Sequence, residues 1–224
     1  MKLTPDLLLR AYALGIFPMA ESREETEIHW IDPELRGILP LDQLHVPRRL
    51  KKELRQNRFQ VTCNRAFPDV IQHCAEPAQD RQETWINNRI EKLYSELNQM
   101  GFAHSVECWQ TTDDGQTILA GGLYGVSLGA AFFGESMFSR TKNASKIALV
   151  HLVLRLRKSG FLLLDTQFST PHLRQFGVID VPRDHYKALL SKALMQTPRL
   201  AETLSQEELW AGLNAPHPQS SRPG

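Results

Sequence analysis

Two apolar runs that each end in polar side chains constrain the fold of this 224-residue chain most strongly. Residues 129–134 carry no charge and lead directly into Glu135, and residues 160–164 lead into Asp165 and Gln167. A helix-like stretch separates the two runs, so the order is strand, loop, helix, strand, as in a βαβ unit. Asp165 and Gln167 are two positions apart and therefore point to the same side of an extended strand. We predict that these polar groups lie on the wall of one pocket.

The remaining periodicity predicts a mixed sheet with helices on both faces. We expect helices at 5–14, from about 47, and at 66–75, 87–100, 144–158 and 185–195, and strands at 36–40, 59–63, 103–110, 117–126, 128–133 and 161–165. This assignment puts Glu135 in a loop between a strand and a helix. The fold class is α+β, because antiparallel strands surround a single crossover. We expect a small N-terminal α/β domain over residues 1–58, a main domain over 59–208 and a disordered tail over 209–224.

Composition excludes several classes of protein. With 42% hydrophobic and 23% charged residues the chain is typical of a soluble globular protein, and its longest apolar run is too short for a membrane span. We identify no signal peptide. The three cysteines have no paired spacing, which favours reduced thiols in a cytoplasmic protein. The histidines form no metal-binding motif, so we expect no metal.

Six short motifs occur in order along residues 1 to 200: Gly15-Ile-Phe-Pro-Met19, His29-Trp30 before Asp32-Pro33, Thr84-Trp85-Ile86, Gly121-Gly-Leu-Tyr-Gly125, Gly134-Glu-Ser-Met-Phe-Ser139 and Asp165-Thr-Gln-Phe168. Together they resemble the bacterial leucyl/phenylalanyl-tRNA–protein transferases. The resemblance implies a main domain similar to the GNAT (N-acetyltransferase) fold. It also implies transfer of Leu or Phe, less so Met, from aminoacyl-tRNA to the N-terminal Lys or Arg of a protein, which marks that protein for N-end rule degradation. The aminoacyl ester is already activated, so we expect no cofactor, and we expect a monomer.

Aminolysis of an ester needs a neutral amine and a group that orients it or accepts its proton. If Asp165 holds the side-chain amide of Gln167, the amide oxygen is aimed at the amine, and the resemblance implies such a relay. Glu135 either binds the cationic acceptor or takes part in catalysis. The alternatives are a strand-end Asp that caps a loop, a surface Gln, and a loop acid near a helix start.

The resemblance implies two further subsites. An aminoacyl pocket would be lined by apolar residues that could equally form core: Leu123, Phe132, Met137, Leu149, Leu156 and Leu164. The terminal 3′ adenosine would be held by stacking on Trp30, Trp85 and Tyr94, although Trp85 also suits a core position.

Basic residues are concentrated in one segment. Residues 48–58 hold six basic residues and one acid, a local charge of 6 − 1 = +5, although the whole chain carries only +1. Arg48, Lys52 and Arg55 share a helical face opposite Leu50 and Leu54. With Arg49 and Lys51 they are candidates for tRNA backbone contacts beside Trp30, and the alternative is a solvated face.

Two other functions remain open. An acetyl-CoA-dependent N-acetyltransferase of the same fold needs a glycine-containing pyrophosphate loop, and residues 138–145 contain no glycine. A non-catalytic RNA-binding module would need neither Asp165 nor Gln167.

Overall fold

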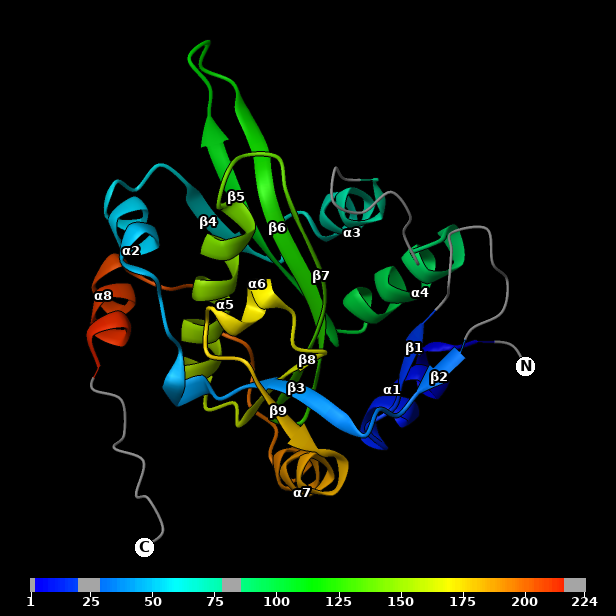
Figure 1. Ribbon diagram of the computed structural model, residues 1–224. Coiled ribbons are helices and arrows are strands. Elements are labelled where there is room, and N and C mark those ends of the chain that lie inside the picture. Colours follow the sequence, from blue (N-terminus) through cyan, green and yellow to red (C-terminus); the bar gives the residue numbers. More distant parts are fainter. Residues whose placement is uncertain (1–2, 20–28, 78–85, 216–224) are drawn as a thin grey trace, which may run out of the picture.

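A seven-stranded mixed sheet runs through the molecule, in the order β4-β5-β6-β7-β8-β3-β9 (Figure 1). The computed structural model describes residues 3–19, 29–77 and 86–215. The strands of the sheet are β3 (Leu35–Leu39), β4 (Gln60–Cys63), β5 (Ala103–Thr111), β6 (Thr117–Leu128), β7 (Ala131–Ser139), β8 (Leu163–Gln167) and β9 (Ile179–Pro182). A separate ribbon pairs β1 (Phe17–Met19) with β2 (His29–Ile31).

The central crossover follows the prediction. Strand β7 leads into helix α5 (Ala144–Ser159) and then into β8, which pairs parallel with β7. The other strand pairs of the sheet are antiparallel. Helix α5 ends at Gly160, whose φ of 80° lies in the left-handed region that glycine adopts without a steric penalty. The predicted βαβ unit and the α+β class are confirmed.

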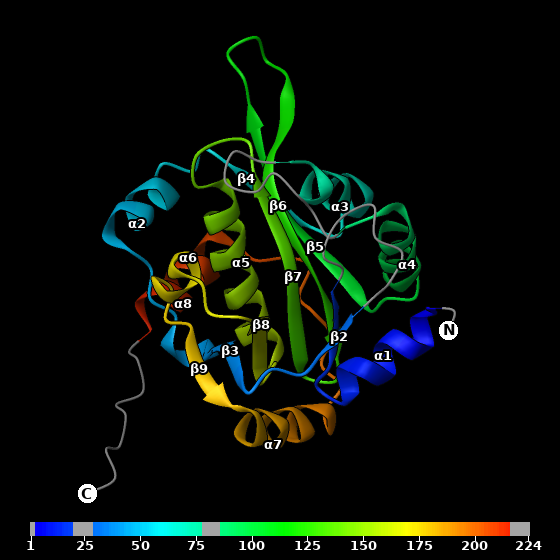
Figure 2. The same cartoon turned by 45° about the vertical axis from the view of Figure 1, so that its right-hand side comes forward.

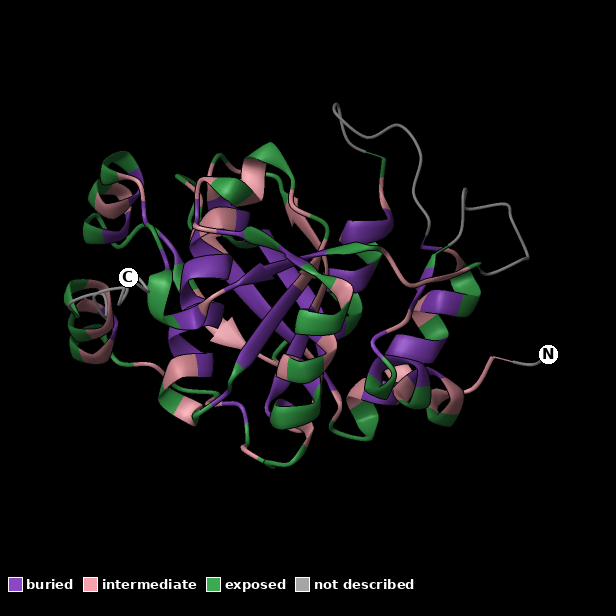
Figure 3. Cartoon of the chain, turned by 60° about the horizontal axis from the view of Figure 1, so that its bottom comes forward, coloured by how far each residue is buried: buried purple, intermediate pink, exposed green. Residues whose placement is uncertain are grey.

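Helices cover both faces of the sheet (Figure 2). Helices α2 (Arg48–Arg55), α5 and α8 (Gln206–Asn214) contribute to one apolar cluster. Helices α1 (Pro5–Ala13), α3 (Phe67–Ala75), α4 (Asn88–Gln99) and α7 (Arg183–Leu194) contribute to the other. Figure 3 shows the result, with buried residues concentrated in the sheet and α5 and exposed residues on the outer helices. The short helices η1 (Leu41–Gln43) and α6 (Pro171–Arg174) lie in connections.

Two predictions about the ends of elements were wrong. Strand β7 does not stop at Phe133 but continues to Ser139, because β6 is long enough to pair with it as far as Gly121. Glu135 therefore belongs to a strand and not to a loop. The disordered tail predicted from residue 209 is also wrong, because a capping box between Ser205 and Glu208 starts α8 and Leu209 is buried. Residues 216–224 lie outside the described residues.

The domain boundary predicted near residue 59 cuts through one packed unit. Strand β3 lies between β8 and β9 and pairs with both. Helix α2 buries Leu50 and Leu54 in the cluster around α5. Both elements come from the segment assigned to a separate N-terminal domain. A local pattern does not reveal such long-range pairing, so the boundary was placed by composition alone.

Candidate active site

The candidate site lies where β7 and β8 separate. The two strands pair only between Ala131–Phe133 and Leu163–Asp165. Beyond that, β7 stays with β6, and β8 turns at Gln167, whose φ is 63°. A cavity of about 270 Å³ opens between them, at the carboxyl ends of the only parallel pair in the described sheet. Its lining residues are Leu123, Tyr124, Gly134, Glu135, Ser136, Met137, Leu149, Leu152, Leu164, Thr166, Phe168, Thr170, His172 and Leu173.

Most of the cavity wall is apolar. Four of the six residues predicted for an aminoacyl pocket line it, namely Leu123, Met137, Leu149 and Leu164. The other two predicted residues do not.

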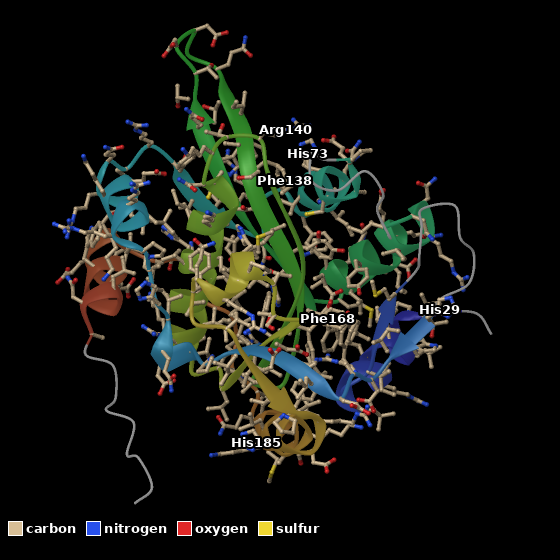
Figure 4. All side chains as sticks on the ribbon, in the orientation of Figure 1. His29, His73, Phe138, Arg140, Phe168 and His185 are labelled. Atoms are coloured by element: carbon tan, nitrogen blue, oxygen red, sulfur yellow. The ribbon has the colours of Figure 1, made fainter. Side chains whose placement is uncertain are left out.

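Phe132 and Leu156 are instead fully buried in the core. Phe132 lies in the stretch where β7 and β8 are still paired, and Leu156 lies near the far end of α5. Sequence analysis did not identify Leu152 or Phe168 as wall residues. Figure 4 shows Phe168 next to the end of β8.

Asp165 is held in a fully buried ion pair. The Arg36 guanidinium donates through Nε to Oδ1 (2.9 Å) and through Nη2 to Oδ2 (2.7 Å), and Tyr186 Oη donates to Oδ2 (2.7 Å). Arg36 is 1% exposed and lies between the rings of Phe17 and Tyr186, at 4.4 and 4.6 Å from their centroids. Burial disfavours the guanidinium charge, but the Asp165 carboxylate outweighs it and raises the pKa of Arg36. The negative charge of Asp165 is therefore matched inside the protein.

Gln167 bridges the two strands in a way that the sequence did not predict. Its backbone N–H donates to Asp165 Oδ1 (2.7 Å), and its side-chain Nε2 donates to Glu135 Oε1 (3.1 Å). The prediction that Asp165 holds the side-chain amide was wrong, because the left-handed turn at Gln167 directs the backbone N–H to Asp165 and the side chain across the gap. Asp165 fixes the backbone, and Glu135 fixes the amide.

Glu135 faces the cavity and accepts hydrogen bonds from two tyrosines. Tyr12 Oη donates to Oε1 (2.7 Å) and Tyr94 Oη donates to Oε2 (3.0 Å). Burial raises the pKa of Glu135 to about 7, although the hydrogen bonds from both tyrosines act in the opposite direction. This carboxylate can therefore gain and lose a proton close to neutral pH.

The aromatic residues predicted to hold an adenosine are not brought together. Tyr94 is fully buried, and its ring packs edge-on against Tyr124 at 5.4 Å, so it offers no face to a base, and that assignment was wrong. Trp30 is half-buried on β2, and its role stays a prediction. Trp85 lies outside the described residues.

The predicted basic helix forms as expected. Leu50 and Leu54 of α2 are buried, and its exposed Arg48, Lys52 and Arg55 are called the basic face from here on. Arg49 is also exposed and Lys51 is half-buried.

The basic face does not lie beside Trp30, although the two are close in sequence. Helix α2 and strand β2 lie on opposite sides of the molecule in both Figure 1 and Figure 2, and they pack against different apolar clusters. The inference from sequence proximity was therefore wrong.

Sequence analysis missed three residues that build the site: Arg36, Tyr12 and Tyr186. Each carried a signal, because a charge at the start of a short apolar strand or a tyrosine on an otherwise aliphatic helical face needs a buried partner. The partners themselves were not visible, since Arg36 and Asp165 are 129 positions apart.

The described ranges contain neither a cluster of three potential metal ligands nor a helix with the length and apolarity to cross a membrane. His29, His73 and His185 lie in separate parts of the molecule (Figure 4).

Comparison with known proteins identifies close relatives. Residues 38–191 match the family model described as leucyl/phenylalanyl-tRNA protein transferase, and residues 1–34 match the model of its N-terminal domain. A leucyl/phenylalanyl-tRNA–protein transferase of Paramagnetospirillum magneticum is 58% identical over 195 residues, which cover 87% of this chain and 91% of the relative. One of Afipia carboxidovorans is 55% identical over 193 residues, which cover 86% and 83%. Among solved structures, a crystal structure of FemX has a TM-score of 0.45 and 12% identity, and the match covers 88% of this chain and 66% of that one. The chain belongs to the leucyl/phenylalanyl-tRNA protein transferase family.

Proposed function

We propose that this protein transfers Leu or Phe, and less readily Met, from aminoacyl-tRNA to the α-amine of an N-terminal Lys or Arg of an acceptor protein. The product carries a new N-terminal residue that marks it for N-end rule degradation. The enzyme acts in the cytoplasm as a monomer, without metal or cofactor. The observation that carries this proposal is an apolar cavity that ends at Glu135, a carboxylate not paired with a cation in the described structure.

The reaction is the aminolysis of an ester. The acceptor nitrogen attacks the carbonyl carbon, a C–N bond forms, and the C–O bond to the terminal ribose breaks. The amine loses one proton and the ribose oxygen gains one. The ester is the more reactive species, so no nucleotide has to be consumed.

The donor side chain occupies the apolar part of the cavity. Met137 lines it with a flexible thioether, which adapts to side chains as different as those of Leu and Phe. Ile and Val are branched at Cβ and fill the entrance differently. Discrimination by one methyl group contributes only about 1–3 kcal/mol, so selection against them is moderate.

The acceptor amine approaches at the polar end of the cavity. Asp165 is neutralised by Arg36, which leaves Glu135 as the carboxylate that faces the cationic N-terminus. Gln167 is anchored through its backbone by Asp165 and through its amide by Glu135, and so it is placed to orient the amine. In this arrangement Asp165 acts through Gln167 and does not itself meet the substrate.

The tRNA body binds through charge. The basic face of α2, with Arg49 and Lys51, supplies phosphate contacts that do not depend on sequence. Trp30 and Trp85 remain our candidates for stacking on the terminal adenosine.

A direct assay tests the proposal against its alternatives. The protein is incubated with leucyl-tRNA and a peptide that starts with Arg, with a peptide that starts with Asp as the matched acceptor control. We expect leucine on the Arg peptide alone, and a strong loss of turnover with little loss of tRNA binding in Gln167→Ala. Acetylation of the peptide from acetyl-CoA, or tRNA binding without transfer, would refute the proposal.

A further inference from the structure

Glu135, Tyr12 and Tyr94 form a closed ring of three oxygen–oxygen contacts. Glu135 Oε1 lies 2.7 Å from Tyr12 Oη, Tyr12 Oη lies 2.6 Å from Tyr94 Oη, and Tyr94 Oη lies 3.0 Å from Glu135 Oε2. The three residues come from β7, α1 and α4. All three distances are within the range of hydrogen bonds, so each contact is stabilised only if it contains one proton.

The number of protons in the ring depends on the state of Glu135. When the carboxylate is ionised, the two tyrosine protons both serve the carboxylate, and the shortest contact, between Tyr12 and Tyr94, has no hydrogen. When Glu135 is protonated, Oε2 donates to Tyr94, Tyr94 donates to Tyr12, and Tyr12 donates to Oε1. All three contacts are then hydrogen bonds, and Gln167 Nε2 still donates to Oε1. The geometry therefore has a place for one additional proton.

We propose that Glu135 accepts the proton of the attacking amine and that the ring with Tyr12 and Tyr94 stores it. This inference rests on the proposed aminoacyl transfer. As the C–N bond forms, the nitrogen gives one proton to Glu135. As the C–O bond breaks, the ribose oxygen receives one proton and the ring gives up the one it holds, so the ring is unchanged after each turnover. Glu135 is the catalytic residue, and Tyr12 and Tyr94 are positioning residues.

The surroundings of Glu135 are consistent with this role. It lines the cavity, and its contact with Gln167 puts the proton acceptor beside the group that orients the amine. Asp165 is unsuited to the task because its oxygens already accept from Arg36, Tyr186 and the Gln167 backbone. A pKa of about 7 lets Glu135 take and release a proton under working conditions.

Other titratable groups face the same region from every packed element. They are Arg36 on β3, Tyr124 on β6, Asp165 on β8, His172 on α6 and Tyr186 on α7. The experiment must therefore separate Glu135 from these groups, which site-specific variants can do.

The ring is tested first in the free enzyme, without tRNA or acceptor. Infrared difference spectra are recorded across pH, and the carbonyl band of a protonated carboxylic acid is followed. We expect a titration near pH 7 that is absent in Glu135→Gln. Tyr94→Phe and Tyr12→Phe should each move the midpoint upward by about one pH unit, because the ionised carboxylate loses a charge-assisted hydrogen bond. Tyr186→Phe is the matched control, since its hydroxyl contacts Asp165, and it should move the midpoint far less.

The proton transfer is tested next by single-turnover kinetics with leucyl-tRNA. The rate should rise with pH through the pKa of Glu135, and this limb should move upward in both tyrosine variants by the shift seen in the infrared. At neutral pH that shift lowers the rate on the order of tenfold. A limb that belongs to the acceptor amine would stay in place in these variants.

Two results would overturn the proposal: a carboxylic acid band that persists in Glu135→Gln with no other titration near neutrality, or a rate limb that does not move in either tyrosine variant. Failure of the proposed function is distinguishable from both. If the infrared titration is as expected but no donor is transferred, the aminoacyl transfer is refuted, and with it the amine as the source of the proton, whereas the ring stands as a titrating site.

Discussion

Replacing Arg36 with Met should destabilise the protein severely. Met has a similar length and no charge, so the variant leaves the Asp165 carboxylate buried with Tyr186 and one backbone N–H as its donors. Both members of the pair are at most 1% exposed, so water cannot replace the guanidinium. Breaking such a pair costs about 3–5 kcal/mol. Loss of the two ring contacts adds roughly 1 kcal/mol, which brings the expected loss to about 4–6 kcal/mol.

The measurement is urea unfolding followed by circular dichroism, together with thermal melts. For a chain of this size the loss corresponds to a fall in Tm of roughly 8–24 °C. The double variant Arg36→Met with Asp165→Asn is the control, because the amide keeps an oxygen for Tyr186 and for the Gln167 N–H but carries no charge. We expect it to recover at least half of the lost stability. A loss below about 1 kcal/mol in the single variant would refute the reasoning, as would a double variant no more stable than the single one.

Three further perturbations test other parts of the structure. Neutralising the basic face should weaken binding of leucyl- and phenylalanyl-tRNA equally and flatten the slope of log affinity against log salt by about 0.9 per lost phosphate contact; an unchanged slope would place the RNA elsewhere. Met137→Ala should raise the use of Ile- and Val-charged tRNA relative to leucyl-tRNA, whereas Phe132→Ala should cost about 3–5 kcal/mol of stability with little change in preference, and the opposite pattern would show that the cavity is assigned incorrectly. Gly37→Ala should lower activity, because its Cβ would lie 2.6 Å from the Phe168 carbonyl carbon and would displace the chain after Gln167; wild-type turnover would show that this close approach is not needed.

Local pattern predicted most of the elements in this protein because their apolar faces repeat with the period of a helix or strand. The first helix begins where Thr4 caps it, and α5 ends at Gly160 as expected. The βαβ unit followed, since a helix between two apolar runs has few ways to pack.

The site was less predictable because it depends on contacts between distant segments. Glu135 was named as a functional residue, but not its place on a strand or its tyrosine partners from α1 and α4. Asp165 was named without Arg36, since no periodicity links the two positions. Gln167 was expected to extend the strand, yet its positive φ turns the chain there. Such a conformation depends on the buried carboxylate that receives its N–H and not on the propensity of glutamine.

The position of β3 has a consequence for synthesis on the ribosome. This strand emerges early, but its neighbours β8 and β9 are among the last strands to be made. Arg36 precedes its partner Asp165 by 129 positions, which corresponds to on the order of ten seconds of translation at about 5–20 residues per second. During that interval both edges of β3 are unpaired and the guanidinium has no carboxylate. The nascent chain therefore cannot close its sheet strand by strand. It closes when β8 and β9 arrive on either side of a strand that has been waiting for them, and a chain that is released before that point lacks both the completed sheet and the anchored Gln167.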